Sequence, residues 1–342
     1  MKLLTLVVPV YNTEKYLERC LDSVLTAETA PITEVVAVND GSTDSSLEIL
    51  KRYKESFGDS LVIIDKENGG HGSAVNAGVK AATGKYLRIL DSDDWFDTEN
   101  FISFLDSLSE CDEDLIITPY RQVHTYSNEE VRFEYGFLES GVTLSLSDVR
   151  FNTDTPIFAL ASSTYKVSLL RECGLELFEK TFYVDMQFNI YPIPYLETVK
   201  YLDLDIYRYF IGRPEQSMSE ESLRRHLPDH LKVLRFLIDY YAEHEGTADE
   251  SRRYYMGLLI YLMYYTATDL VCMKHPDRKA AYDTFKDLDG YLERKAPHVY
   301  RWVGDFPYVR VTRMLRYLNV RFGNCAVVFA LDTLRRIRRK NK

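Results

Sequence analysis

Three aspartates within four residues, Asp91, Asp93 and Asp94, follow an apolar stretch at residues 86–90. Carboxylates this close repel one another and raise each other's pKa unless a positive group lies among them. Asp91 and Asp93, on either side of Ser92, could bind Mg²⁺ or Mn²⁺, hard cations that prefer oxygen ligands and complete their shells with water and substrate phosphates. The alternative is a solvated turn in which Asp94 caps the next helix, and by itself the motif leaves both open.

Two further polar segments have compositions that suit nucleotide recognition. Asp40 ends another apolar stretch, and a carboxylate there could accept hydrogen bonds from a nucleobase, although the residues after it could serve only to turn the chain and cap a helix. Three glycines, Gly69, Gly70 and Gly72, precede a helical pattern, where the backbone can approach a phosphate closely. The spacing fits neither a P-loop nor the dinucleotide-binding fingerprint, so this loop alone is a weak signal.

The elements that must position these residues are four short apolar stretches separated by amphipathic segments, at residues 3–8, 34–38, 61–64 and 86–90. This pattern predicts parallel strands covered by helices on both faces. Because ligands bind beyond the carboxyl ends of such strands, we expect the four following loops to converge on one pocket. Further along, strand-like runs are found at residues 130–137, 157–160, 199–201 and 206–210, and after residue 219 the pattern predicts long helices.

The composition of the 342-residue chain, 46% hydrophobic and 27% charged, is ordinary for a soluble globular protein. Its net charge of -10 argues against general nucleic-acid binding. The five scattered cysteines lack metal-binding spacing and predict reduced packing residues of a cytoplasmic protein. The first residues resemble a signal peptide superficially, but Thr5 and Pro9 interrupt the apolar run, and a buried strand is the better interpretation.

Four motifs of this chain occur in the order and with the spacing that is found in family 2 glycosyltransferases: VVPVYN, VVAVNDGSTDSS, NGGHGSAVNAG and LDSDDW. The sequence resembles that family closely over residues 3–100 and loosely to about residue 218. The resemblance implies an α/β fold of the A-type glycosyltransferase class, with a Rossmann-like nucleotide-binding mixed sheet and here a helical C-terminal region. We therefore expect a glycosyltransferase domain at 1–218, with a nucleotide-sugar-binding part (1–118) and an acceptor-binding part (119–218), followed by a helical region at 219–342.

The resemblance also implies roles for individual residues. In the family, the residues matching Pro9, Tyr11 and Asp40 hold uracil, and those matching Asp91 and Asp93 bind ribose and metal, with Asp93 the best candidate to bind Mn²⁺ or Mg²⁺. Val75 stands where the family usually has Arg or Lys, and His71 either replaces that cation or packs. The expected nucleotide-sugar-binding residues are Pro9, Tyr11, Asn12, Asp40, Gly69, Gly70, Asn76, Asp91, Ser92 and Arg213.

An inverting transfer needs a general base to deprotonate the acceptor hydroxyl. The family takes this base from a Glu-Asp pair, and in the matching stretch FYVDMQFNI Val184 replaces the first acid while Asp185 keeps the second position. Asp185 is therefore the expected catalytic base, and the alternative is that it only caps a helix. Arg213, in the segment that closes over the donor in the family, could bind the diphosphate as a bidentate cation.

The C-terminal region contains two segments with membrane-like features. Residues 254–273 are long enough to span a membrane, but Asp269 and the recurring tyrosines favour a buried amphipathic helix. From residue 311 to the end, nine Lys or Arg residues accompany one acid and a short apolar patch at 326–331. This combination fits an interfacial helix on an anionic membrane, and a solvated helix end or an oligomer contact fits equally well.

The resemblance thus implies a metal-assisted inverting glycosyltransferase that uses a nucleotide sugar, most often a UDP-sugar. From the family alone, the expected acceptor is a hydroxyl of a glycan, glycolipid or glycoprotein in surface polysaccharide or glycoconjugate assembly. The expected location is the cytoplasm, with the inner face of the plasma membrane as the site of peripheral contact. Two alternatives stay open: a sugar nucleotidyltransferase, although the basic Gly-rich loop it needs after the first strand is missing, and a catalytically degenerate nucleotide-sugar binding module.

Overall fold

The computed structural model describes residues 2–124, 127, 129–212, 220–271 and 277–314. The chain divides into two compact units, Met1–Gln216 with Asp249–Arg252, and Ser217–Ala248 with Arg253–Lys342. The first unit contains every described strand, and the second is built from helices. Arg213, Cys272, Cys325 and the basic cluster after Thr333 lie outside the described residues.

An eight-stranded mixed sheet forms the centre of the first unit, in the order β3-β2-β1-β4-β10-β6-β11-β9. The first four of these strands are parallel, as the apolar stretches predict. Strand β10 is antiparallel to both of its neighbours, which makes the sheet mixed and confirms the predicted fold class. The strands are β1 (Leu4–Val10), β2 (Thr33–Asp40), β3 (Leu61–Lys66), β4 (Tyr86–Ile89), β6 (Leu115–Ile117), β9 (Thr143–Ser145), β10 (Ser163–Lys166) and β11 (Thr198–Tyr201).

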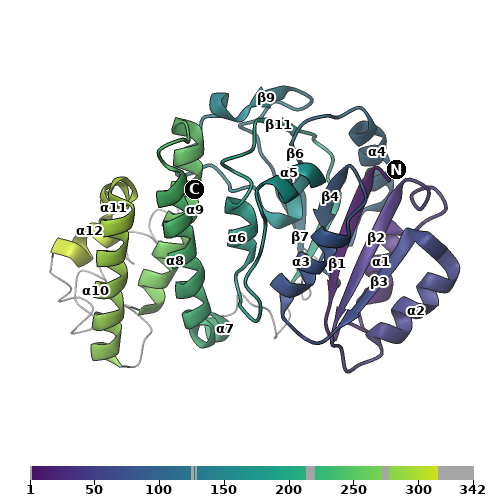
Figure 1. Cartoon of the computed structure of the whole chain (residues 1–342), viewed down its shortest axis with the longest axis horizontal. Helices are drawn as coiled ribbons and strands as arrows, with labels where there is room; N and C mark the ends of the chain where they lie inside the picture. The colour runs from purple at the N-terminus through teal and green to yellow at the C-terminus, as the bar shows by residue number, and fades with distance from the viewer. Residues whose placement is uncertain (1, 125–126, 128, 213–219, 272–276, 315–342) are drawn as a thin grey trace. The chain divides into compact units, whose positions relative to one another are not determined.

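Helices cover both faces of the parallel part of this sheet (Figure 1). Leu6 and Val8 of β1 pack in one core with α1 (Leu17–Val24), α2 (Ser46–Phe57) and α4 (Thr98–Ser109). Val36 and Val38 of β2 pack against Ala74 of α3 (His71–Ala81) on the other face. Because successive side chains of a strand point to opposite faces, strands buried on both sides need continuous apolar runs, which is the pattern in the sequence.

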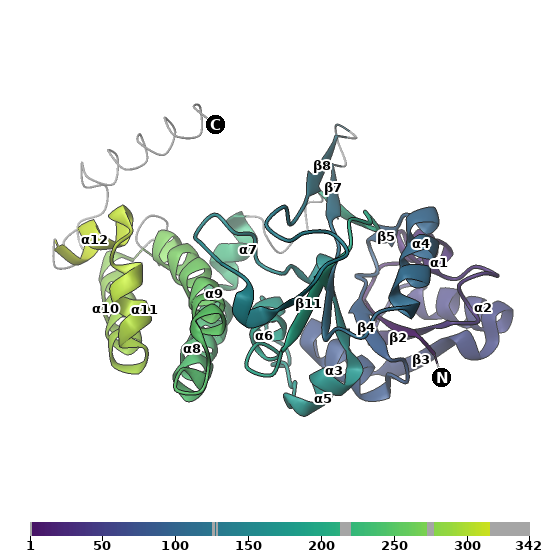
Figure 2. The same ribbon diagram turned by 90° about the horizontal axis from the view of Figure 1, so that it is seen from above.

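A smaller four-stranded sheet has the order β5-β12-β7-β8. It joins β5 (Trp95–Phe96), directly after the acidic motif, to β12 (Tyr207–Ile211), which lies more than a hundred residues further along the chain. Strand β12 is parallel to β7 (Tyr120–His124), and β7 pairs with β8 (Glu130–Phe133) as an antiparallel hairpin (Figure 2). Two short helices, α5 (Val167–Glu172) and α6 (Asp185–Ile190), complete the first unit, together with 3₁₀ turns at Gly58–Ser60, Leu146–Asp148 and Leu160–Ser162.

The expected strand at residues 157–160 is wrong. Strand β10 begins instead at Ser163. The apolar character of the earlier residues reflects packing, because Phe158 is fully buried and its ring lies 6.1 Å from that of Tyr135. A short buried loop and a short strand have the same apolar signal, so the pattern could not separate them.

The predicted C-terminal helices are confirmed over the described residues. They are α7 (Glu220–Arg225), α8 (Leu227–His244), α9 (Glu250–Asp269), α10 (Arg278–Lys295), α11 (Pro297–Val303) and α12 (Pro307–Met314). In the second unit, Asp289 of α10 is buried and accepts hydrogen bonds from Tyr264 of α9 and Arg313 of α12, which ties the three helices together. Among the helices described, none has the length and apolar character needed to cross a membrane.

Candidate functional site

The loops after β1, β2, β3 and β4 lie at the carboxyl edge of the parallel strands, and each of them contacts the next. The amide oxygen of Asn12 accepts from the backbone N–H of Thr43 at 2.8 Å and links the first loop to the second. Asp40 links the second loop to the glycine loop (residues 68–72), and His71 Nε2 lies 3.0 Å from Asp91 Oδ1. The expected convergence of the four loops is therefore present in the structure.

Asp40 organises the glycine loop. Its buried carboxylate accepts hydrogen bonds from the backbone N–H groups of Gly69 at 2.9 Å and Gly70 at 2.7 Å, and from Lys66 Nζ at 2.7 Å. Gly70 has φ of 82°, which glycine adopts without strain. A carboxylate has about four acceptor positions, so Asp40 keeps capacity for one further donor. Its contact with a nucleobase stays a prediction.

The three residues expected from the first loop have different surroundings. Pro9 is buried within β1, and Tyr11 is 51% exposed. Asn12 has φ of 52°, and its backbone N–H and side-chain oxygen both bond to residues of the second loop. Tyr11 therefore presents a ring to solvent where a planar base could stack, whereas the side-chain oxygen of Asn12 is engaged in holding the two loops together.

Asn76 of α3 is hydrogen bonded to the main chain of Leu177 in both directions: its Nδ2 donates to the carbonyl oxygen, and its Oδ1 accepts from the N–H, each at 2.9 Å. The docking segment (residues 177–184), which precedes Asp185, is held further by Lys180, whose N–H donates to the Gly69 carbonyl at 2.6 Å. The amide of Asn76 thus has a positioning contact that the sequence did not indicate, and its predicted donor contact stays a prediction.

The docking segment has an unusual backbone. Lys180 and Tyr183 have φ of 48° and 63°, in the left-handed region that non-glycine residues seldom adopt. Ser73 Oγ donates to Glu179 Oε1 at 3.0 Å, and a Cβ at Gly72 would lie only 2.3 Å from the carbonyl oxygen of Phe178. Such conformations persist where surrounding contacts over-determine them, which is the case between this segment and α3.

Asp185 is the first residue of α6, and Val184 occupies the capping position without a side-chain hydrogen bond. The Asp185 carboxylate itself accepts backbone hydrogen bonds at the start of the helix, so its role at the helix end stays an alternative to the catalytic one. The Asp185 side chain reaches solvent, yet the protein atoms around it displace water and raise its pKa. The positive charge of His71 opposes this rise, and the negative charge of Asp91 adds to it. The catalytic base predicted from the sequence therefore lies within electrostatic reach of the loops after β3 and β4.

His71 supplies one positive group to this acidic site. Desolvation lowers its pKa, but the hydrogen bond to Asp91 and the charges of Asp91, Asp185 and Asp93 outweigh that effect, so the net pKa is raised. Both side chains of the His71 and Asp91 pair are about one-third exposed, at 37% and 35%. The sequence left His71 open between packing and ligand contact, and the structure places it against the acidic turn (residues 91–94).

The acids of the acidic turn divide into two kinds. Asp94 is fully buried and accepts hydrogen bonds from the hydroxyl of Tyr207 at 2.7 Å and the N–H of Phe210 at 2.8 Å. Burial and the neighbouring carboxylates hold the Asp94 pKa well above its usual range. The alternative in which Asp94 caps the next helix is wrong, because Asp97 caps α4 by accepting from Asn100 N–H at 3.1 Å.

Asp91 and Asp93 are the partly exposed acids of the turn, and Ser92 between them is buried. Within the described part of the chain, no group of three His, Cys, Asp or Glu side chains is placed to hold a metal ion. Two carboxylates nevertheless fit Mg²⁺ or Mn²⁺ when substrate phosphates and water supply the remaining ligands. The donor set thus fits a cation shared with a phosphorylated ligand and does not form a closed protein site.

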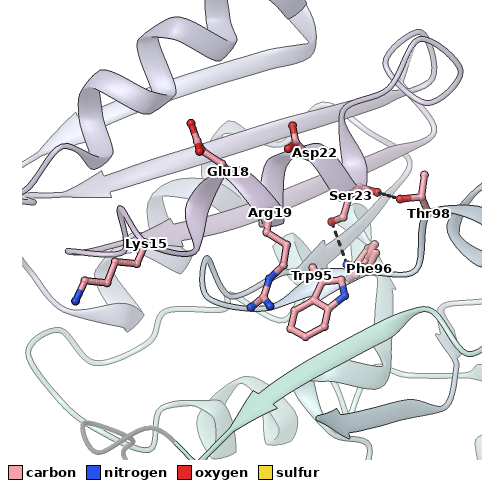
Figure 3. Close-up of a pocket in the computed structure, with 8 residues that line it drawn as sticks. All are labelled: Lys15, Glu18, Arg19, Asp22, Ser23, Trp95, Phe96 and Thr98. Atoms are coloured by element: carbon pink, nitrogen blue, oxygen red, sulfur yellow. Dashed lines mark hydrogen bonds between the residues drawn. The ribbon is translucent and has the colours of Figure 1, made fainter. Parts of the chain in front are cut away.

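A separate open hollow of about 540 Å³ lies along α1 and β5 (Figure 3). None of the site residues predicted from the sequence lines it. Ser23 at its wall accepts from the Phe96 N–H at 3.0 Å and fastens β5 to α1. The lining residues are Lys15, Glu18, Arg19, Asp22, Ser23, Trp95, Phe96 and Thr98.

Comparison with known proteins identifies the family and the fold. The model of the family described as "Glycosyl transferase family 2" matches residues 5–174. An uncharacterized glycosyltransferase of Bacillus subtilis, EpsJ, is 30% identical over 239 residues, which is 67% of each chain. Glycosyltransferase GlyA of Streptococcus pneumoniae is 36% identical over 40% of this chain and 19% of its own length. The poly(ribitol-phosphate) beta-glucosyltransferase of Bacillus spizizenii is 31% identical over 49% of this chain and 26% of its own length.

The matched segments therefore span about a fifth to a quarter of the last two relatives. Among solved structures, Staphylococcus aureus TarS 1-349 in complex with UDP-GlcNAc superposes with a TM-score of 0.70, at 20% identity, covering 94% of this chain and 90% of that chain. At that identity the likeness shows the fold alone. The chain belongs to family 2 of the glycosyltransferases, and its fold is the A-type glycosyltransferase fold.

Proposed function

We propose that the protein transfers a sugar from a nucleotide sugar, in the first place a UDP-sugar, to an acceptor hydroxyl with inversion at the anomeric carbon. The observation that carries this proposal is the docking of the segment before Asp185 onto the glycine loop, through the 2.6 Å hydrogen bond from Lys180 N–H to the Gly69 carbonyl. That contact keeps a carboxylate with a raised pKa near the acidic turn. The UDP-GlcNAc complex of TarS supports the choice of donor.

In this proposal the donor lies across the edge of the parallel strands. Tyr11 stacks on the base, and Asp40 accepts from it with its remaining acceptor position. The α3 N-terminus follows the glycine loop and favours the negative charge of the diphosphate. When bound at Asp91 and Asp93, a divalent cation would neutralise charge that develops on the departing diphosphate.

Asp185 performs the proton transfer in this proposal. As the acceptor oxygen forms its bond to the anomeric carbon, its proton passes to the Asp185 carboxylate, and the bond from the anomeric carbon to the diphosphate oxygen breaks. A raised pKa makes Asp185 a stronger base than an ordinary aspartate. The positive charge of His71 opposes this rise.

The acceptor is proposed from chemistry and from the relatives. One relative is named a poly(ribitol-phosphate) beta-glucosyltransferase, which supports a hydroxyl of a surface polysaccharide or related glycoconjugate. We also propose a cytoplasmic location with the basic C-terminus on an anionic membrane. Sedimentation of the full chain and of a chain ending at Thr333 with anionic liposomes tests the contact, and equal binding of the two would refute it.

A panel of nucleotide sugars, assayed for transfer and hydrolysis with and without Mn²⁺, tests the proposed activity. Asp185→Asn should keep donor affinity and lose transfer by about 10²–10⁴-fold, the usual contribution of a general base. Asp93→Ala should lose cation-dependent donor binding, whereas Asp59→Asn, at a fully exposed aspartate, is the control. Retained transfer in Asp185→Asn would exclude Asp185 as the base, and binding without turnover in the unaltered protein would favour a binding module.

A further inference from the structure

Arg19 of α1 contacts the acidic turn. Its Nη2 atom lies 3.3 Å from the main-chain carbonyl oxygen of Asp93 and donates a hydrogen bond to it. The guanidinium carbon is 3.6 Å from the centroid of the Trp95 ring and 4.6 Å from that of Phe210. Figure 3 shows Arg19 extending from α1 to the Trp95 ring. The cation is thus fixed by two aromatic rings and one carbonyl.

The same aromatic cluster connects the turn to β12. The Phe210 ring packs edge-on against Trp95 at 5.7 Å, while its N–H donates to the buried Asp94 carboxylate. The backbone N–H of Asp91 points to the Tyr207 hydroxyl at 3.3 Å. Arg19 therefore closes a cluster that holds the turn between α1 and β12.

Arg19 also places a positive charge near two carboxylates of the turn, Asp93 and Asp94. Burial lowers the Arg19 pKa, and the charges of Asp94 and Asp93 oppose this decrease, which places both acids within electrostatic reach of the guanidinium. An arginine stays protonated at neutral pH. The acidic turn consequently has a permanent cation on α1, independent of any bound metal ion.

We propose that Arg19 is a positioning residue for donor binding, which holds the acidic turn in its cation-binding arrangement before the donor and metal arrive. This inference rests on the proposed function, in which Asp91 and Asp93 bind the cation. Without the guanidinium, repulsion among the acids favours an open turn, and ligand binding must then order it. The expected effect is on affinity for the metal and nucleotide, because Arg19 does not contact the proposed base, Asp185.

The experiment uses the full chain with Trp302→Phe, which leaves Trp95 as the sole tryptophan. UDP is titrated at a fixed Mn²⁺ concentration, and Mn²⁺ at fixed UDP, with Trp95 fluorescence and calorimetry as readouts. Arg19→Gln removes the charge and keeps a hydrogen-bond donor, and Arg19→Lys keeps the charge. Arg52→Gln is the matched control, because Arg52 on α2 pairs with Glu18 on the exposed side of α1. Thermal unfolding of each variant is measured without ligand.

We expect Arg19→Gln to weaken binding of UDP with Mn²⁺ about tenfold and to raise the donor KM similarly, with kcat within about twofold. Arg19→Lys should recover most of that loss. Equal affinities of Arg19→Gln and Arg52→Gln would overturn the inference. If Arg19→Gln does not fold, Arg19→Met, which keeps packing between the rings, takes its place with the same expectation. If Asp93→Ala also leaves UDP and Mn²⁺ binding unchanged, the proposed cation site fails, and with it the basis of this inference.

Discussion

The side chain of Asn76 and the main chain of Leu177 exchange two hydrogen bonds of 2.9 Å, although 101 residues separate them in the chain. Asn76 belongs to the helix that follows the glycine loop, and Leu177 begins the segment that ends at Asp185. One side-chain amide therefore contributes two of the contacts that fix the proposed base relative to the proposed donor site. Its two bonds also satisfy main-chain groups that a buried loop must pair.

Replacing this amide should uncouple the two parts of the site. Asn76→Ala is expected to lower the free energy of unfolding by about 1–3 kcal/mol, because it leaves two main-chain groups of Leu177 without their partner. The kcat should fall by on the order of tenfold or more through misplacement of Asp185, with a smaller change in UDP affinity. Urea denaturation and steady-state kinetics measure both. The control is Asn100→Ala on α4, which removes one side-chain bond to the Asp205 carbonyl oxygen and should leave kcat unchanged.

The decrease of kcat/KM at acidic pH should follow the protonation of Asp185. Because its folded pKa lies above the ordinary 3.8, kcat/KM should begin to fall at a higher pH than for an unperturbed aspartate. His71→Gln removes the positive charge that lowers this pKa, so the decrease should move to higher pH. Profiles from about pH 4 to 8 test this, with His298→Gln in the second unit as control. A decrease that stays in place or moves to lower pH in His71→Gln would contradict the assignment.

The contact between His71 and Asp91 should also give the fold a pH-dependent stability. The folded pKa of His71 is raised above its unfolded value of 6.5. Its contribution to stability is therefore fully present below pH 6.5 and is lost as pH rises through the folded pKa. Urea midpoints of the unaltered protein and His71→Gln should thus differ most below pH 6.5 and converge above the folded pKa of His71, which a series of denaturation curves would establish.

Gly78 permits the close approach of α3 to β1. A Cβ at this position would lie 2.2 Å from Val7 Cγ1, a contact that the packed sheet cannot relieve cheaply. Gly78→Ala gains up to about 1 kcal/mol of helix propensity, but overpacking should outweigh it and lower stability by about 1–3 kcal/mol. Gly136→Ala, whose added Cβ meets nothing within 4 Å, should change stability by less than about 0.5 kcal/mol. Denaturation curves for both variants measure these changes, and equal stabilities of the two variants would contradict the close packing of α3 on β1.

In the second unit, two aspartates of α10 should contribute very different amounts to the free energy of unfolding. Asp289 is 1% exposed and accepts from Tyr264 at 2.6 Å and from Arg313 Nε at 2.8 Å. Asp289→Ala leaves the Arg313 charge without its carboxylate and should cost about 3–5 kcal/mol. Asp287 pairs with Arg235 at the surface, so Asp287→Ala should cost less than about 1 kcal/mol. Similar losses for the two variants in urea denaturation would count against this role of Asp289.

Local patterns predicted much of the first unit. The four apolar stretches became parallel strands, because a strand covered on both faces needs a continuous apolar run. The polar residues at their ends met at one edge, because parallel strands all end on the same side of the sheet. The four motifs also identified the family. The short stretch at 157–160 was misread, because burial in a loop and burial in a strand require the same residue types.

By itself the sequence determined which carboxylates could do chemistry and which strand ends would present them. Only the tertiary structure decided what each one contacts. Asp94 could cap a helix or face a ligand by its type alone, but in the structure it is buried and accepts a hydrogen bond from the Tyr207 hydroxyl, 113 residues away. The same holds for Arg19 against Asp93 and for Asn76 against Leu177. These contacts join side chains to distant segments, and no local periodicity records them, because their distances are set by the packing of whole elements.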